Sequence, residues 1–369
     1  MKGKNSSKLA WVWALSVPLL ALLLSFAVCS LLLSLYDADP VVAYGALFRG
    51  SLIGRYNISE TIAIMIPLLL IALGIAVAQT GDNQNIGGEG QLHMGALGAA
   101  LVAVYMPANT PIYISIPLLM IVGCLFGMIW ILIPAVMKVK RGVSEIVMTV
   151  MMNEIAKGIV SCLLSGSMKD PNSPIHQTVA FGDNWTLPVL IPKTKIHLGF
   201  VVAIILTVVL WVYLNKMTGG LEVRAVGQCQ KAARYAGMPV KRVAIFTFLL
   251  SGALAGLAGA CEVSGIYHRL IDGFSFGFGY TAIVISLLGK RNPLKIAIAA
   301  FCFSMLITGA NAMQRAVGTP SMLASVIQAV TVFFWMISEY VITNLRRFLE
   351  TKARNARRRQ AASAVAADG

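Results

Sequence analysis

Long apolar runs are the feature of this sequence that most limits its fold. An α-helix rises about 1.5 Å per residue, so about 20 mostly apolar residues span the hydrocarbon core of a bilayer. Ten segments are candidates, at residues 11–35, 61–79, 91–106, 113–137, 143–165, 197–215, 243–263, 278–289, 293–311 and 321–343. Segments 91–106 and 278–289 are short; if both were re-entrant, eight or fewer would cross. We predict an all-α, polytopic membrane protein with ten transmembrane helices, some of them short or discontinuous.

The composition excludes an ordinary soluble enzyme. Of the 369 residues, 57% are hydrophobic and 12% are charged, and the mean hydropathy is +0.77. Soluble domains contain about 45–50% apolar and about 25% charged residues. Taken alone, the net charge of +15 would also suit a nucleic-acid-binding protein, because phosphates are neutralised by clustered basic residues.

The positions of the basic residues indicate membrane orientation instead. With ten crossings and both termini cytoplasmic, 22 of the 30 Lys and Arg residues lie on the inner side and 7 on the outer side, as the enrichment of basic residues in cytoplasmic loops requires. The predicted organisation is a cytoplasmic tail (1–10), a transmembrane domain (11–343) with a cytoplasmic loop (216–242) and an extracytoplasmic loop (166–196), and a basic cytoplasmic tail (344–369). The basic tail can meet anionic membrane lipid, and no nucleic-acid partner is expected.

The sequence offers no catalytic or metal-binding constellation. It has no Ser/His/Asp set, no phosphate-binding glycine loop and no pair of carboxylates at helical spacing. The six cysteines and four histidines are scattered singly, without the spacing of metal ligands or of a redox pair. We therefore expect no catalytic residue, no metal and no cofactor.

A polar, glycine-rich segment, GDNQNIGGEGQ at residues 81–91, separates two apolar runs; we name it the polar island. Each glycine costs about 1 kcal/mol relative to alanine inside a helix, so its four glycines should interrupt the helix. Irregular backbone at membrane depth is tolerated where protein buries it or where it lines a watery cavity, and transporters form substrate sites there. Asn85, Glu89 and Gln91 are therefore candidates for a substrate pathway. The alternative is a plain cytoplasmic loop.

A second polar group, Asn153, Glu154 and Lys157, lies in the segment 143–165. Glu154 and Lys157 can form an ion pair at i, i+3 spacing. An ionisable residue within a membrane span is expensive and is by default a functional candidate. We therefore add Asn153 and Glu154 to the pathway candidates. The alternative is an internal ion pair that fixes packing.

Two further segments predict contacts between helices or with a partner. Small residues in the segment 243–263 favour close helix packing rather than ligand binding, and the candidates are Gly252, Gly256 and Gly259. Residues 230–236 predict a short helix that Gly237 and Pro239 end. This helix lies in the cytoplasmic loop and is too small to fold alone, so it is either a partner-docking element or a solvated connector.

Four motifs resemble those of a known family. Residues 85–91, NIGGEGQ, resemble the N-I-G-x-E-G-Q signature of bacterial ABC importer permeases in the branched-chain amino acid, ribose and nucleoside permease superfamily. The other motifs resemble its nucleoside and simple-sugar branch, and lie at residues 148–156, at 224–227 with 232–237, and at 268–275. The resemblance extends from about residue 11 to 343.

The resemblance implies a transport subunit of the bacterial cytoplasmic membrane that is not itself an enzyme. It would form the translocation pathway for a nucleoside delivered by an extracytoplasmic binding lipoprotein. Its other partners would be a second homologous permease and ATPase subunits at the cytoplasmic face. The polar island would lie in the pathway, where its amide and carboxylate groups could bind ribose hydroxyls or a base edge. The resemblance assigns ATPase coupling to Ala232, Ala233, Arg234, Tyr235 and Gly237.

The sequence departs from the family pattern at three places. An aromatic residue usually precedes N-I-G, where this chain has Gln84 after the polar residues 81–83. The coupling segment usually begins with Asn-Pro, where this chain has Cys229-Gln230, and loss of an N-cap asparagine costs about 1 kcal/mol. The family often has an aromatic residue at the position of Glu154.

Three other functions remain as alternatives. One is a simple-sugar ABC importer permease of the ribose type. Another is a proton-coupled secondary transporter with Glu89 and Glu154 as the proton relay; such a protein would not need an ATPase-docking helix. The third is a non-transporting membrane scaffold, which the polar island disfavours.

Overall fold

The computed structural model describes residues 23–31, 33–35, 39–107, 109–318, 326, 329–330, 333–334, 337–338 and 341. This part of the chain consists of helices and loops with two isolated β-bridges and contains no β-strand. It divides into two compact units, one of residues 1–48 with 309–369 and one of residues 49–308.

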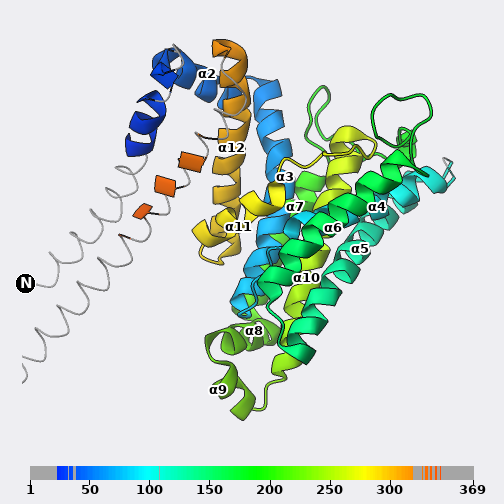
Figure 1. The fold of residues 1–369 in the computed structure, drawn as a ribbon, viewed down its shortest axis with the longest axis vertical. Coiled ribbons are helices and arrows are strands. Elements are labelled where there is room, and N and C mark those ends of the chain that lie inside the picture. Colours follow the sequence, from blue (N-terminus) through cyan, green and yellow to red (C-terminus); the bar gives the residue numbers. More distant parts are fainter. Residues whose placement is uncertain are drawn as a thin grey trace, which may run out of the picture. The chain divides into compact units, whose positions relative to one another are not determined.

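The helices follow one another along the chain as Figure 1 shows. Their bounds are α2 (Pro40–Leu52), α3 (Arg55–Thr80), α4 (Gly88–Tyr105), α5 (Ile112–Arg141), α6 (Glu145–Ser165), α7 (Gly199–Lys216), α8 (Thr218–Gln228), α9 (Gln230–Tyr235), α10 (Val240–Glu262), α11 (Phe278–Leu288) and α12 (Pro293–Val317). A 3₁₀ turn covers Asp183–Trp185, and a π-helical turn, Val263–Tyr267, continues α10.

Six helices of the described part are long and apolar enough to cross a membrane: α3, α5, α6, α7, α10 with its π-helical turn, and α12. They correspond to six of the ten predicted segments, which confirms the all-helical membrane class. The predicted segment 91–106 is α4, and 278–289 is α11, whose 11 residues are too few to span a bilayer. Segments 11–35 and 321–343 fall mostly outside the described residues. The number of crossings and the side of each terminus therefore stay predictions.

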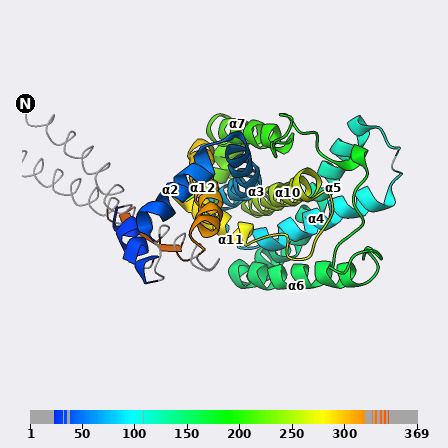
Figure 2. The same cartoon turned by 90° about the horizontal axis from the view of Figure 1, so that it is seen from above.

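In the unit 49–308, α3 and α10 form the centre (Figure 2). The apolar windows of α3 and α10 are 89% and 67% buried, whereas those of α5, α6 and α7 are 22% to 28% buried. A helix that is apolar on all sides and buried on all sides belongs to the middle of a bundle. α10 packs along α3, α4 and α5.

Glycines let α4 and α5 approach α10 closely. Gly95 of α4 lies against the backbone of Gly256, and Gly127 of α5 lies against Gly252, with no room for a Cβ atom at either place. Gly259 lies equally close to the backbone of Leu92 in α4. The three small residues assigned to helix packing thus lie at backbone contacts within the chain, where dispersion between closely packed helices is strongest.

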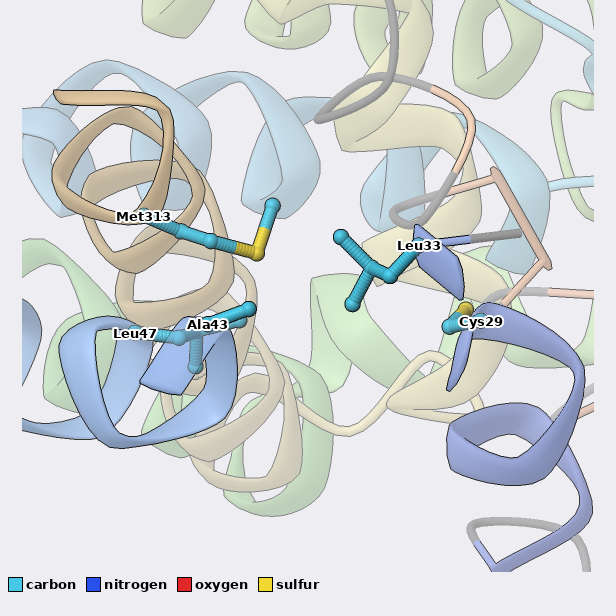
Figure 3. Packing of buried hydrophobic residues seen from close by; sticks show 5 residues of the cluster. All are labelled: Cys29, Leu33, Ala43, Leu47 and Met313. Atoms are coloured by element: carbon cyan, nitrogen blue, oxygen red, sulfur yellow. The ribbon is translucent and has the colours of Figure 1, made fainter. Parts of the chain in front are cut away.

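In the unit 1–48 with 309–369, a small core joins α2 to the end of α12 (Figure 3). Ala43 and Leu47 of α2 pack with Met313 of α12 and with Cys29 and Leu33, and all five are buried. Tyr44 adds a hydrogen bond of 2.6 Å from its hydroxyl to the carbonyl oxygen of Phe26.

Candidate functional site

The polar island connects α3 to α4 at the end of the bundle where α8 and α9 lie (Figure 1). Helix α4 begins at Gly88, so the helical interruption covers residues 81–87 rather than the whole island. Within the interruption, Asp82 and Gln84 are exposed while Asn83 and Asn85 are buried. Glu89 and Gln91, in the first turn of α4, are each 1% exposed. The island is thus mostly enclosed by the chain itself.

Asn85 and Gln91 form a closed pair of amides. The Asn85 Nδ2 donates to Ser251 Oγ of α10 at 2.8 Å and to Gln91 Oε1 at 3.0 Å. Asn85 Oδ1 accepts from Gln91 Nε2 at 3.0 Å and from the Gly87 amide at 2.8 Å. These bonds use all the polar atoms of the Asn85 side chain, as burial requires.

The pair lies well inside the bundle. Ser251 lies 11 residues beyond the first residue of α10, which corresponds to about 16 Å along the helix axis. Since the hydrocarbon core of a bilayer is about 30 Å thick, Asn85 lies close to mid-depth if α10 begins at the membrane surface.

Asn153 of α6 supports the island from another side. Its Oδ1 accepts a hydrogen bond of 2.8 Å from the amide of Gly90, and its Nδ2 donates to the carbonyl of Ile86 at 3.0 Å and to the Tyr280 hydroxyl at 3.4 Å. Gly90 packs so closely against the backbone of α6 that a Cβ atom there would lie 2.9 Å from Asn153 Cα. A glycine in this helical turn is therefore required by packing, which offsets its low helix propensity.

Glu89 joins two helix N-termini. It lies in the first turn of α4, and its Oε2 accepts a hydrogen bond of 2.7 Å from the amide of Gly279, in the first turn of α11. The unpaired amides at a helix N-terminus carry partial positive charge, so both ends stabilise a carboxylate. α11 therefore begins inside the bundle at Glu89, which explains why it is only half a membrane span in length.

One face of α6 carries polar groups to the surface of the unit. Lys157 Nζ and Glu154 Oε1 lie 3.0 Å apart, and the side chains are 36% and 67% exposed. Lys157 also lies over the Tyr280 ring, 5.6 Å from its centre. Farther along the same face, Ser161 Oγ donates to Asp272 Oδ2 at 2.8 Å. Residues 154, 157, 161 and 165 repeat at helical spacing, and we name Glu154, Lys157, Ser161 and Ser165 the polar face of α6.

The opposite end of the bundle contains a second charged group that the sequence alone did not reveal. Lys195 Nζ lies 3.1 Å from Glu60 Oε1 of α3 and 5.2 Å from the centre of the Tyr56 ring. Burial alone would lower the pKa of Lys195, but hydrogen bonds to Tyr56 and Glu60 and the charge of Glu60 raise it overall. Because 135 residues separate Lys195 from Glu60, no local pattern could predict the pair.

His197 directly follows the loop 166–196, two residues before α7 begins at Gly199, and is buried against glycines. Its ring packs against Gly265 of the π-helical turn, and its Nδ1 accepts a hydrogen bond of 3.2 Å from the amide of Gly199. Burial, with a smaller contribution from the charge of His268, lowers the pKa of His197 to about 4. Its Nε2 has no hydrogen-bond partner among the described residues.

The short helix expected at 230–236 is α9. Its end is a turn in which Gly237, with φ of 80°, donates to the Arg234 carbonyl and Met238 donates to the Ala233 carbonyl, both at 3.0 Å. This pattern is the usual glycine-dependent helix stop. Ala233 is buried, whereas Ala232 and Arg234 are exposed and Tyr235 is 94% exposed. α9 thus exposes an aromatic ring and a guanidinium group at the surface of the unit.

The side chains around the polar island are suited to hydrogen bonding rather than to metal chemistry. In the described part of the chain, no three His, Cys, Asp or Glu side chains lie together as metal ligands would. Four residues at the site had no predicted role: Ser251, Thr149, Tyr280 and Asp272, although Asp272 belongs to the motif at 268–275. Ser251 and Thr149 contact the island, and Tyr280 and Asp272 contact α6. Each of these contacts joins residues that are 63 to 166 positions apart in the sequence.

Comparison with known proteins finds one family and several relatives. Residues 57–336 match the family described as the branched-chain amino acid transport system permease component. The glucose ABC transporter permease protein TsgB13 of Haloferax volcanii is 35% identical, covering 90% of this chain and 89% of the relative. The guanosine ABC transporter permease protein NupP of Bacillus subtilis is 33% identical, covering 92% of this chain and 98% of the relative. The nucleoside ABC transporter permease protein NupB of Lactococcus lactis is 30% identical, covering 93% of this chain and 96% of the relative.

All three organisms also contain a second, less similar permease named for the same substrate class; in Haloferax volcanii it is the putative glucose permease TsgC13, 23% identical to this chain. NupQ of Bacillus subtilis, a guanosine permease, is 28% identical and covers 67% of this chain and 79% of the relative. NupC of Lactococcus lactis, a nucleoside permease, is 26% identical and covers 65% of this chain and 77% of the relative.

Proposed function

This chain belongs to the permease component family of branched-chain amino acid transport systems, and on that basis we propose that it forms the translocation pathway for a nucleoside in an ABC importer. As an ABC transporter permease subunit, it is a multi-pass protein of the cell membrane and is not itself an enzyme. Membership of the family implies an ATPase and a binding protein as partners. The binding protein in this proposal is an extracytoplasmic lipoprotein that delivers the nucleoside.

The similarity to NupP is the observation that carries the nucleoside assignment. This chain covers 98% of that guanosine permease at 33% identity, and NupB, a nucleoside permease, is similar over nearly its whole length. The second candidate substrate is a simple sugar, because the glucose permease TsgB13 is 35% identical. Nucleosides and sugars share hydroxyl groups that amides and carboxylates bind, so the two candidates are chemically related.

In this proposal the pathway passes the polar face of α6. Exposed charges on a membrane-spanning helix are expensive unless they face water or another protein, and Glu154 is the most exposed of them. Asn85, Glu89, Gln91 and Asn153 are buried, and their hydrogen bonds hold the interrupted helices in place.

The cytoplasmic side is proposed to be the end that carries α8 and α9. The last turn of α5, with Lys138, Lys140 and Arg141, supplies basic residues there, as the preference of Lys and Arg for cytoplasmic loops requires. The exposed side of α9, with Ala232, Arg234 and Tyr235, would then meet the ATPase, supported by the buried Ala233 and the turn at Gly237. Ten crossings, with the short α11 as part of a discontinuous one, cytoplasmic termini and the loop limits 166–196 and 216–242 complete the proposed topology.

A second homologous permease is the proposed partner within the membrane. The organisms that contain NupP and NupB each also contain a second permease of the same substrate class, which supports a pair of unlike subunits. The polar face of α6 is a surface that such a partner could close into a channel.

Uptake by the reconstituted complex tests the proposal. Proteoliposomes with both permeases and the ATPase, supplied with the binding lipoprotein outside, should take up tritiated guanosine only when ATP is inside. Excess unlabelled guanosine should compete with it, and glucose should not. Uptake of glucose in place of guanosine would establish the sugar alternative. Uptake without ATP that a protonophore abolishes would overturn the ABC proposal in favour of a secondary transporter.

A further inference from the structure

Asp82, Asn83 and Gln84 form a turn that four helices contact, and we name it the turn 82–84. The Asn83 Nδ2 donates to Thr247 Oγ1 of α10 at 2.8 Å. The Gln84 amide donates to Glu145 Oε1, at the start of α6, at 3.4 Å. The remaining contacts come from α5 and α9, so the turn is a junction between elements that are far apart in the sequence.

Lys138 of α5 is the cation that holds the junction together. Its ammonium group donates to the carbonyl oxygen of Asp82 at 3.3 Å, to Asn83 Oδ1 at 2.7 Å and to Glu145 Oε1 at 2.6 Å. An ammonium group has three protons, so these bonds use all of them. Lys138 and Glu145 are only 21% and 16% exposed, and partial burial strengthens the pair over one at the surface. The turn is thereby fixed to the ends of α5 and α6.

α9 reaches the same turn through its first residue. The Gln230 Nε2 donates to Asp82 Oδ2 at 3.2 Å. Cys229, at the N-cap of α9, forms no side-chain cap hydrogen bond, and the exposed contact between Gln230 and Asp82 links the start of α9 directly to the turn 82–84. Just before it, Gly227 at the end of α8 lies against the Thr80 carbonyl with no space for a Cβ atom.

Asp82 has a left-handed backbone conformation, which is less favourable for a residue with a side chain than for glycine. Asp82 ends α3 in a turn with φ of 61°, where its amide donates to Gln79 O at 3.3 Å and the Asn83 amide donates to Ala78 O at 3.0 Å. Glycine is the usual residue at this left-handed position, and any side chain there costs backbone energy. A strained residue persists where surrounding contacts hold it, and such residues gather at functional positions.

Beyond the turn, the chain enters the buried part of the polar island directly. Asn85 is three residues after Asp82 and is bonded to α10, and Ile86 and Gly90 are bonded to Asn153 of α6. A displacement of the turn 82–84 would therefore be transmitted to α10 and α6 through adjacent residues that are packed and hydrogen-bonded to one another. Contiguous networks of this kind carry energetic coupling between sites.

We propose that the Asp82–Gln230 hydrogen bond is the link through which movement of α9 reaches the turn 82–84 and, through Lys138, the ends of α5 and α6. The inference rests on the proposed function, because α9 is the element that would face the ATPase. Asp82 and Gln230 act here as positioning residues. Their contribution is to the yield of transport per ATP, not to assembly or to substrate recognition.

Substitutions that keep or remove the acceptor test the link in the reconstituted complex. Asp82→Gly keeps the left-handed backbone and removes the carboxylate, whereas Asp82→Asn keeps both an acceptor and a residue that tolerates this backbone. Gln230→Ala removes the donor. The measurements are ATP hydrolysis, ATP-dependent uptake of guanosine or of glucose, whichever the wild type transports, and co-purification of the ATPase.

Asp82→Gly and Gln230→Ala should each lower the amount transported per ATP by about fivefold. Co-purification of the ATPase should not change, and Asp82→Asn should stay close to the wild type. The double variant Asp82→Gly/Gln230→Ala should be no worse than either single variant, because the two side chains form one contact. A merely structural role would lower assembly and would not be rescued by asparagine.

Gln228→Ala is the matched control. Gln228 is exposed and lies two residues before Gln230, and its side chain forms no hydrogen bond with any of the described residues. Its transport per ATP should equal that of the wild type. An unchanged ratio in Asp82→Gly, or losses that multiply in the double variant, would overturn the link alone. A wild-type complex without ATP-dependent uptake would overturn the proposed function and the link with it.

Discussion

Buried polar residues in this chain are stabilised by backbone groups more than by opposite charges. Glu89 is held by the amide at the start of α11 and lies at the start of α4, so two helix ends supply the positive field that a carboxylate needs. Asn85 and Asn153 likewise bond to backbone amides at Gly87 and Gly90. Glycines at those positions let the polar side chains come close enough.

The buried side chain of His197 predicts how the stability of the folded protein depends on pH. Its pKa is about 4 in the folded protein and about 6.5 in an unfolded chain, so the unfolded state takes up a proton first as the pH falls. Stability is therefore complete above about pH 6.5 and falls by about 3 kcal/mol between pH 6.5 and pH 4. We expect the unfolding temperature of the purified protein to fall more between pH 7 and pH 5 than that of His197→Gln.

His176→Gln is the control for this measurement, because His176 is an exposed histidine of the loop 166–196. Its unfolding temperature should depend on pH as that of the wild type does. If His197→Gln and the wild type lost the same amount of stability on acidification, the buried neutral histidine would not be the cause.

Two of the departures from the family pattern are linked by the contacts that these residues make. Gln230 replaces part of the usual start of the coupling segment, and Asp82 lies in the unusually polar stretch before the N-I-G motif; the two side chains are hydrogen-bonded. Glu154, at a position where the family often has an aromatic residue, pairs with Lys157. Asp82, Gln230 and Glu154 therefore each have a polar partner in this chain, which a list of single positions would not reveal.

At the level of helices, packing around α10 gives a prediction about stability. A Cβ atom at Gly256 would clash with the carbonyl oxygen of Gly123 and lie 3.0 Å from Gly127 Cα, and backbone atoms cannot move aside as side chains can. Overpacking of this kind costs about 1–3 kcal/mol. We expect Gly256→Ala to lower the unfolding temperature and the yield of monodisperse protein in detergent.

Gly158→Ala is the matched control, because Gly158 lies within α6 and has open space where its Cβ atom would be. Alanine should leave stability unchanged or raise it by up to about 1 kcal/mol through helix propensity. Equal unfolding temperatures for the two variants would show that the close approach of α5 to α10 does not limit stability.

The limits of the helices could be predicted from the sequence only in part. The length of the apolar runs identified the six long helices, because a helix that spans a bilayer must be apolar over that length. α3, however, begins at Arg55 rather than at residue 61, since its first turn contains polar residues such as Asn57, which donates a hydrogen bond to the Ile53 carbonyl. Glycine propensity alone predicted an interruption throughout 81–91, yet α4 begins at Gly88 because Gly88 and Gly90 pack against neighbouring helices. Partners such as Asn83 and Thr247, 164 residues apart, depend on tertiary packing and had no local signal.

At the level of the whole molecule, orientation depends on α7 separating two loops. The extracytoplasmic assignment of 166–196 and the cytoplasmic assignment of 216–242 require them to lie on opposite sides of the membrane, and α7 (Gly199–Lys216) is an apolar helix of sufficient length between them. Lys and Arg counts favour 216–242 as the inner loop.

Cysteine labelling tests that orientation, because Cys229 is exposed at the start of α9. A membrane-impermeant maleimide should label the wild type in inside-out vesicles, and Cys229→Ser should lower that labelling, while labelling of intact cells should be the same for both. Asn172→Cys, at an exposed position of the loop 166–196, should add labelling in intact cells only. The opposite pattern for the two sites would place α9 outside the cell, where it could not meet an ATPase, and would reverse the topology on which the ATP-driven mechanism depends.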